Sequence, residues 1–383
     1  MPVVSGEQVI ATILKHDKKT TSYKIALLRS INDLVLMYPD VACQGQDVAV
    51  PLNRLAELWI AYYWSFADEL NPIAQRGHTT GNDMAFRPLL THLRQEWQQA
   101  VQLSSQAADG FFLLTEMRTP RRRDTYPATL RRVYERTVAS IVKAIRMPIQ
   151  YAGAGHWSVF EKPASYGQLF SAAMPLPGTQ SQDECVIVPA SLWEAFHRLS
   201  MYVEALCLHE WCLFTESITQ NIDRHITRGE VYTLLTARPD DRIALSWERN
   251  QVNLLLLEKV PISCPWTGKH LTEPHHYDLD HLLPLKIYPI NELWNLLPVD
   301  KTYNQHIKRD RVPDSAKLLA AQPLVAAAYS AYHQSIKLRN AVREDAGLRF
   351  ANLPAGPTYT AALAQRALAF IDSVATARFA TRF

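Results

Sequence analysis

The N-terminal part of the chain carries apolar positions that recur at helical spacing, separated by short breaks. The first clear stripe covers about residues 22–38 and predicts an amphipathic helix that Pro39 ends. A second helix, apolar and ending in aromatic residues, is expected to begin near Pro51, and a third to cover about residues 84–103. These stripes predict a helical N-terminal unit.

Further along the chain the pattern stays mostly helical, except between about residues 153 and 190, where glycine, proline and serine are frequent. Residues 156–160 and 185–188 are strand candidates there, and the segment fits either a small sheet or a mobile lid. The helical period predicts further helices at about 130–146, 190–219, 228–236, 247–259, 314–344 and 358–378.

The stretch of residues 264–313 departs from this helical pattern. A short alternating run at 277–280 predicts a half-buried strand, and an apolar run at 293–297 predicts a second one. Asp300 is a candidate N-cap for a helix that begins at Lys301. The expected local order is therefore strand, loop, strand and helix.

Four polar residues interrupt these elements where the flanking apolar pattern would predict core. Asp280 and His281 follow the first strand, and Asn295 lies in the second. Asn304 falls about one turn into the helix, so that it faces back toward the strands. Taken singly, each has an ordinary structural interpretation as a turn residue, a core histidine, a loop residue or a cap residue.

Taken together, these residues resemble the signature of the HNH, or ββα-metal, endonuclease superfamily in its H-N-N variant. The gaps of fourteen residues from His281 to Asn295 and nine from Asn295 to Asn304 match the HNH domains of RNA-guided CRISPR effector nucleases. The frame is also similar to single-chain HNH proteins of prokaryotic defence islands. It comprises Asp278-Leu279-Asp280-His281, Pro284, Asn291-Glu292-Leu293-Trp294-Asn295-Leu296-Leu297-Pro298, Lys308 and Val312-Pro313.

The resemblance implies hydrolysis of a phosphodiester bond by an activated water, with products that carry a 5′ phosphate. His281 would act as the general base, because imidazole exchanges protons near neutral pH, and Asn295 would orient it. Asp280 and Asn304 offer hard oxygen ligands that suit Mg²⁺ or Mn²⁺ better than zinc. Lys308 and Arg309 would hold neighbouring phosphates.

One spacing departs from the family pattern. The family usually carries Asn-x-x-Lys on its helix, whereas this chain reads Asn304-Gln305-His306-Ile307-Lys308. Two explanations are open: the helix start is shifted by one residue, or His306 takes over part of the metal-binding work of Asn304.

Charge is nearly balanced over the whole chain, with 40 Lys and Arg against 37 Asp and Glu. A surface for nucleic acid must therefore come from local clustering. The densest basic run contains Arg121, Arg122 and Arg123 and precedes the basic helix at about 130–146. It predicts either an electrostatic track for phosphates or simply a solvated helix face.

The five cysteines, an odd and scattered set, favour a reducing compartment over a disulfide framework. Cys264 lacks the CxxC partner that some HNH proteins use for a structural zinc, so we expect none. Neither a signal peptide nor a membrane-length apolar run is evident, and we expect a cytoplasmic protein with no membrane partner.

These observations predict a mainly α protein, α+β overall, with a small embedded ββα-metal module. The expected regions are a helical N-terminal domain at 1–110, a mixed middle region with the basic segment at 111–243, the nuclease module at 244–313 and a helical C-terminal region at 314–383.

The predicted function is metal-dependent nicking or cleavage of DNA. Duplex is the preferred substrate and RNA is not excluded. One HNH site cuts one strand, so double-strand cleavage would require a homodimer or two encounters. The chain-level resemblance suggests an effector of a prokaryotic anti-phage system, such as the HNH component of Zorya, working with other defence proteins. The alternative is an inactive HNH-like module that binds nucleic acid or a partner.

Overall fold

The computed structural model describes residues 5–38, 41, 45–77, 83–102, 105–169, 173–237, 245–288, 291–350 and 352–383. Pro39, Cys43 and the expected boundary at 243/244 lie outside these residues. The chain divides into two compact units, Met1–Arg238 (unit 1) and Pro239–Phe383 (unit 2). The predicted boundaries at 110/111 and 313/314 each fall inside one of these units.

The chain is mainly helical with small sheets, in agreement with the predicted fold class. The helices of unit 1 are α1 (Gly6–Ala11), α2 (Tyr23–Met37), α3 (Leu52–Tyr63), α4 (Arg87–Val101), α5 (Asp109–Arg118), α6 (Pro120–Arg123), α7 (Ala128–Tyr151), α8 (Ala190–Glu216), α9 (Thr219–Asp223) and α10 (Arg228–Thr236). Short π and 3-10 segments are η1 (Thr12–His16), η3 (Ser65–Ala67) and η4 (Tyr166–Gln168).

Unit 1 packs these helices around large aromatic side chains. Helix α2 lies against α8, and α3 lies against α5 and α7. Trp59, Tyr63 and Trp211 are almost completely buried, and the ring of Tyr63 contacts both tryptophan rings. Because α3 belongs to the expected N-terminal domain and α7 to the expected middle region, the two regions share one core.

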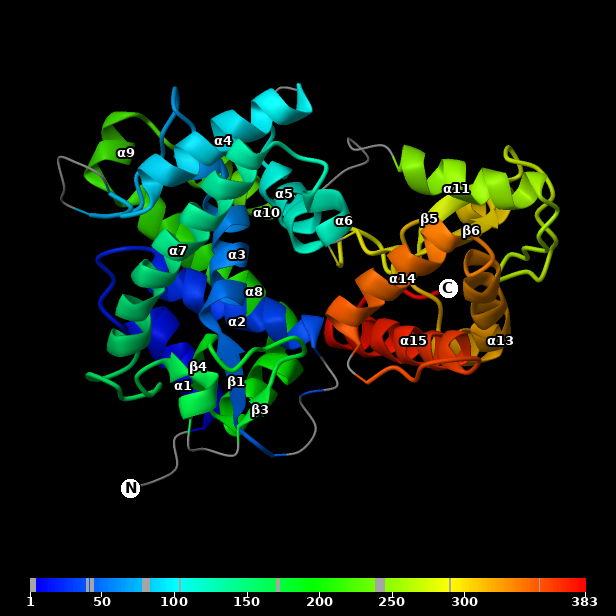
Figure 1. Ribbon diagram of the computed structural model, residues 1–383. Helices are drawn as coiled ribbons and strands as arrows, with labels where there is room; N and C mark the ends of the chain where they lie inside the picture. Colours follow the sequence, from blue (N-terminus) through cyan, green and yellow to red (C-terminus); the bar gives the residue numbers. More distant parts are fainter. Residues whose placement is uncertain are drawn as a thin grey trace. The chain divides into compact units, whose positions relative to one another are not determined.

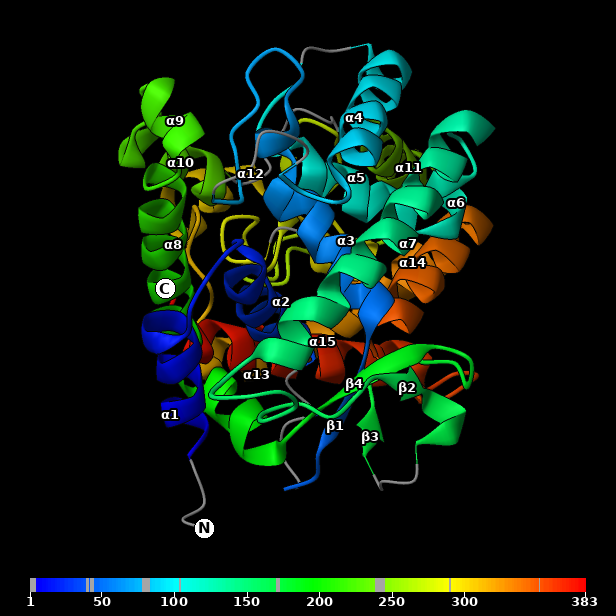
Figure 2. The ribbon, with the colours of Figure 1, turned by 90° about the vertical axis from the view of Figure 1, so that its left-hand side faces the viewer.

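A four-stranded sheet lies at one end of these helices, as Figures 1 and 2 show. Its strand order is β2-β4-β1-β3, with β1 (Val48–Pro51) antiparallel to β4 (Glu184–Val188) and parallel to β3 (Met174–Pro175), and β2 (Ala164–Ser165) at the edge. The segment expected to be a sheet or a lid therefore contributes to a sheet. The strand predicted at 185–188 is confirmed within β4, whereas 156–160 forms turns and bends.

Unit 2 contains α11 (Ser246–Leu257), β5 (Tyr277–His281), the 3-10 turn η5 (Leu293–Asn295), β6 (Leu296–Asp300), α12 (Lys301–Tyr303), the π-helix η6 (Asn304–Lys308), α13 (Ser315–Tyr332), α14 (Ile336–Arg349) and α15 (Tyr359–Ala377). The single helix predicted at 314–344 is wrong. The chain breaks after Tyr332, and the Ser335 side chain caps α14 by accepting from the Leu338 N–H.

The C-terminal helices of unit 2 hold the strand pair through buried polar contacts. The hydroxyl of Tyr329 donates to the carbonyl of Trp294 at 2.5 Å, and the hydroxyl of Tyr332 donates to that of Leu296 at 2.9 Å. The N–H of Leu293 donates to Asp345 at 2.7 Å. These bonds satisfy buried backbone groups of η5 and of the first residue of β6.

Among the described residues, no helix has the length and apolar character needed to cross a membrane.

Candidate active site

The candidate site is built on the antiparallel pair β5 and β6, which follow each other in unit 2 (Figure 1). Tyr277 and Leu279 point into the core, so the intervening Asp278 and Asp280 share the other face of β5. The pairing sets Asp280 opposite Leu297 and His281 opposite Leu296. The first predicted strand is confirmed. The second is confirmed only at 296–297, because residues 293–295, with Asn295, form the 3-10 turn η5 and the strand continues to Asp300.

Asn295 fixes the chain that follows His281. Its side chain is fully buried, its Oδ1 accepts from the N–H of Leu283 at 2.8 Å, and its Nδ2 donates to the carbonyl of Leu283 at 3.0 Å. The N–H of Leu282 also donates to the carbonyl of Asn295 at 2.8 Å. These contacts fix the backbone immediately after His281. Asn295 therefore acts on the position of His281 through the main chain.

The His281 ring is in contact with a different asparagine. The Nε2 of His281 lies 2.5 Å from the Oδ1 of Asn291, a residue that is 6% exposed. Because an amide oxygen only accepts, this contact places the ring proton on Nε2 and leaves Nδ1 as the basic nitrogen. Asn291 belongs to the family-like frame, but no role was predicted for it; its place four residues before Asn295 was the available signal.

Asp280 forms a buried ion pair with Lys308. The ammonium Nζ lies 2.9 Å from Oδ2 and 3.2 Å from Oδ1 of Asp280, and the Lys308 side chain is 1% exposed. The same ammonium donates to the carbonyls of His281 at 3.0 Å and Arg309 at 3.4 Å. Burial raises the pKa of Asp280 to about 6 even though the Lys308 charge opposes that shift.

The helix after β6 explains how Lys308 reaches Asp280. Asp300 caps it as predicted, accepting from the Tyr303 N–H at 2.8 Å. One residue later the chain enters the π-helix, in which the N–H of Arg309 donates to the carbonyl of Asn304 at 2.7 Å. A π turn holds one more residue than an α turn. The additional residue between Asn304 and Lys308 is therefore accommodated inside the π turn. The two explanations from the sequence, a shifted helix start and a metal-binding role for His306, did not include this one.

The side chain of Asn304 contacts Asp278 of β5. Its Nδ2 donates to the Oδ2 of Asp278 at 3.3 Å, and Gln305 donates to the same oxygen at 3.3 Å. The Oδ1 of Asn304 is buried without a hydrogen-bond partner, and so is the Oδ2 of Asp280, apart from its ion pair with Lys308. A buried amide oxygen without a donor and a buried carboxylate are hard ligands of the kind that Mg²⁺ or Mn²⁺ takes, so the residues fit such an ion.

Comparison with protein-family models adds two matches. Residues 5–235 match the family described as Domain of unknown function (DUF8808). The chain belongs to the DUF8808 family. Residues 264–314 match a second model, described as HNH endonuclease. No curated protein and no solved structure matches the chain.

The HNH match covers Asp280, His281, Asn295, Asn304 and Lys308 and lies wholly within unit 2. It supports membership of this segment in the HNH superfamily and suggests a nuclease, with nucleic acid as its substrate. The DUF8808 match, by contrast, lies within unit 1.

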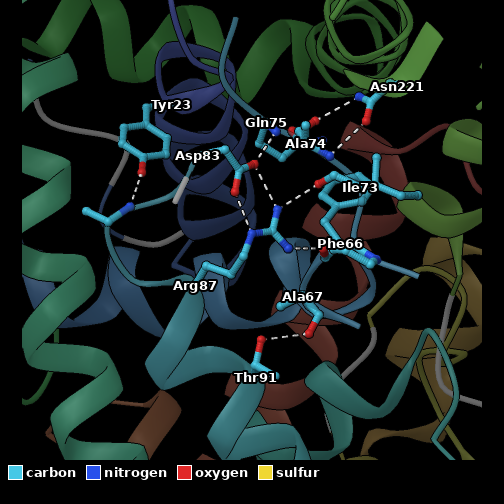
Figure 3. Close-up of polar contacts among 12 residues, drawn as sticks. Tyr23, Phe66, Ala67, Ile73, Ala74, Gln75, Asp83, Arg87, Thr91 and Asn221 are labelled. Atoms are coloured by element: carbon cyan, nitrogen blue, oxygen red, sulfur yellow. Dashed lines mark hydrogen bonds and ion pairs between the residues drawn. The ribbon is translucent and has the colours of Figure 1, made fainter. Parts of the chain in front are cut away.

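Within the DUF8808 segment, the described polar side chains around α4 mainly support the backbone (Figure 3). Arg87 donates to Asp83 and to the carbonyls of Ile73, at 2.8 Å, and Phe66. Asn221 pairs with both backbone groups of Ala74, at 2.8 and 2.9 Å. These contacts fasten the segment between α3 and α4 to neighbouring elements, which is a structural function.

The other sequence-predicted site residues are placed differently from Asp280 and Asn304. His306 and Arg309 are exposed. His306 is two positions from Asn304, so the two side chains leave the helix in different directions. The expectation that Lys308 contacts phosphate does not fit its buried ammonium, which is engaged by Asp280 and two carbonyls.

The three arginines of the basic run form α6 in unit 1 of the DUF8808 protein. Arg122 pairs with Glu116 at 3.1 Å and Arg123 approaches Asp124 at 3.7 Å, so acidic neighbours offset part of this positive charge.

Proposed function

We propose that this protein is a metal-dependent HNH endonuclease that nicks or cleaves DNA. The observation that carries the proposal is the buried, donor-free Oδ1 of Asn304 together with the buried carboxylate of Asp280, in a strand–strand–helix unit whose first strand ends in His281. The HNH match over the same residues supports it.

In this proposal Asp280 and Asn304 would hold a Mg²⁺ or Mn²⁺ ion, which would supply Lewis-acid stabilisation of charge on the phosphate oxygens. His281 takes a proton from the attacking water at Nδ1, because Nε2 is engaged by Asn291. Water adds to phosphorus, the bond from phosphorus to the 3′ oxygen breaks, and the products are a 5′ phosphate and a 3′ hydroxyl. Asn295 keeps His281 in place through the Leu283 backbone.

The proposal is tested with supercoiled plasmid and full-length protein in Mg²⁺ or Mn²⁺, with EDTA as the metal-free control. We expect nicked circles that EDTA and His281→Ala abolish, and a loss of at least about a hundredfold from removal of a general base. Asn304→Ala should raise the metal concentration needed, whereas His306→Ala, which changes an exposed residue of the same turn, serves as the matched control.

A second candidate is an HNH-like module that binds nucleic acid or a partner without cutting. It is favoured by the Lys308 ammonium, which already neutralises Asp280. Binding of duplex DNA with no cleavage in Mg²⁺, Mn²⁺ or Ni²⁺ would support this candidate over the endonuclease. RNA substrates belong in the same assay, because the site chemistry does not distinguish the two backbones.

Contacts to the nucleic-acid backbone are proposed for the exposed Arg309 and for Arg121, Arg122 and Arg123. Reversing the three charges of α6 should weaken DNA binding and flatten its dependence on salt, since fewer counterions are released. An unchanged salt dependence would exclude contacts between these three arginines and the phosphates.

The proposed biological role is that of an effector in a prokaryotic anti-phage system, comparable to the HNH component of Zorya, acting with other defence proteins. It rests on the resemblance of the frame around Asp280 and Asn295. Phage plaque counts on cells that carry the system with wild-type protein or His281→Ala would test it. Conversion of nicked to linear plasmid that rises with protein concentration would support cutting by a homodimer.

A further inference from the structure

A second group of metal-ligand side chains lies at the start of β5, away from the residues proposed for catalysis. Glu273, His275 and His276 are exposed, and their ligand atoms all lie within 4.8 Å of one another. The Oε2 of Glu273 is 3.0 Å from Nε2 of His275 and 3.9 Å from Nε2 of His276. Nitrogen and oxygen ligands on a tetrahedral zinc ion are separated by about 3.3 Å. The two measured separations lie on either side of this value.

The local backbone brings the three side chains together. The N–H of His276 donates to the carbonyl of Glu273 at 3.1 Å, which closes a four-residue turn. Pro274 occupies the second position of this turn, where its fixed φ angle favours the bend. The turn therefore preorganises part of the ligand set, and little conformational freedom would be lost on binding an ion.

We propose that Glu273, His275 and His276 bind a Zn²⁺-class transition-metal ion at a surface site distinct from the candidate active site. Two imidazoles and one carboxylate match the ligands that zinc takes with an open position for water. Mg²⁺ and Ca²⁺ prefer oxygen ligands, so these ions would not compete effectively here.

The turn lies at the opposite end of β5 from His281. Four residue steps separate Tyr277 from His281 in the strand, which corresponds to roughly 13 Å at the usual rise. The carbonyl of His276 accepts from the N–H of Lys301 at 3.1 Å, and Lys301 begins the helical segment that carries Asn304. An ion bound at this turn would therefore stabilise the contact between the start of β5 and that segment.

The test is a Zn²⁺ titration of full-length, EDTA-treated protein by calorimetry, together with thermal unfolding with and without Zn²⁺. We expect one site on the wild type and a rise in melting temperature that EDTA reverses. His275→Ala combined with His276→Ala should lower the affinity at least about tenfold, since even loss of an outer-shell partner commonly costs that much. The same variant should lose the rise in melting temperature.

Controls separate this site from the catalytic one. His270→Ala removes a nearby imidazole that contacts Ser263 and should keep the Zn²⁺ affinity. Asp280→Asn should also bind Zn²⁺ with the wild-type affinity but should lose Mg²⁺-dependent nicking. The double histidine variant should retain Mg²⁺-dependent nicking. No Zn²⁺ binding by the wild type, or equal affinity and stoichiometry in the double histidine variant, would overturn the proposal, whatever the outcome of the plasmid assay.

Discussion

At the scale of single residues, the contact between His281 and Asn291 determines which ring nitrogen can take a proton. Replacement of the Asn291 amide by a carboxylate preserves the shape and the hydrogen bond but adds a negative charge that favours the imidazolium. Asn291 is thus a positioning residue in the proposed reaction, because it acts through His281 and has no assigned contact with substrate.

We predict that Asn291→Asp moves the acidic limb of the pH–rate profile for plasmid nicking to higher pH, because the base must be neutral to act. Asn291→Ala should lower the rate by about ten- to a hundredfold without the same shift. The measurement is the initial nicking rate between pH 5 and 9 at saturating Mg²⁺. Identical profiles for wild type and Asn291→Asp would contradict the role assigned to Asn291.

Asp280 makes the stability of the metal-free protein depend on pH. Burial raises its pKa to about 6 from an ordinary value of 3.8, so the folded chain holds a proton that the unfolded chain releases between about pH 4 and 6. The stabilisation is present below pH 4 and is lost as pH rises through 6, by at most about 3 kcal/mol. We therefore predict a falling free energy of unfolding over this window.

Urea unfolding in EDTA between pH 4 and 7 measures this effect. Asp280→Asn, which cannot titrate, should lose that part of the pH dependence, even though it also leaves Lys308 without its buried partner and lowers stability overall. Parallel pH curves for the two proteins would show that Asp280 does not titrate in this range.

At the scale of secondary-structure elements, the π-helix at Asn304–Lys308 decides how the helical side of the site is presented. The turn keeps Asn304 beside Asp278 while it carries Lys308 into the interior. It ends at Arg309, whose φ of 51° is unusual for a residue with a side chain. The element is thus specified by its packing and not by intrinsic helix propensity.

We predict that deletion of Ile307, which is 44% exposed, converts the π turn to an α turn and restores the Asn-x-x-Lys spacing. Because Lys308 would still reach Asp280, metal-dependent nicking should stay within about tenfold of the wild type. Insertion of one alanine after Ile307 is the matched control and should abolish nicking, since the turn cannot hold a further residue. Loss of nicking in a folded deletion variant would contradict this interpretation.

At the scale of the whole molecule, the C-terminal helices of unit 2 are part of the scaffold of the site. Arg349 of α14 pairs with Glu292 at 3.0 Å, and both side chains are almost fully buried. Glu292 also accepts from the indole N–H of Trp294, next to Asn295. The region expected to be separate, 314–383, therefore positions the turn that carries Asn295.

We predict that Arg349→Met lowers the free energy of unfolding by about 3 to 5 kcal/mol, because it leaves the Glu292 charge buried without its partner. Addition of Glu292→Gln should recover part of this loss. Urea unfolding of the two variants and the wild type measures the effect. A double variant no more stable than Arg349→Met would show that the charge of Glu292 is not the cause.

Local patterns in the sequence were sufficient for most helices, for β5, for the start of β6 and for the Asp300 cap. The spacing of apolar residues, the capping residues and the proline positions are signals within a few residues of each other. These helices and strands form through interactions over the same short range of sequence. The spacing of His281, Asn295 and Asn304 pointed to the segment that matches the HNH model. Strand β1 was missed because four residues before a helix carry too little pattern.

Tertiary structure decided which polar atoms meet. Three contacts join residues that are far apart in the sequence. Asn291 contacts His281 across 10 positions, and Lys308 pairs with Asp280 across 28. Arg349 of α14 pairs with Glu292, beside the Asn295 turn, across 57 positions. Such pairs depend on loop closure and on the π turn, whose hydrogen bonding the surrounding packing selects. The sequence determined which chemical groups are present in this protein, and only the packed chain determined which of them are in contact.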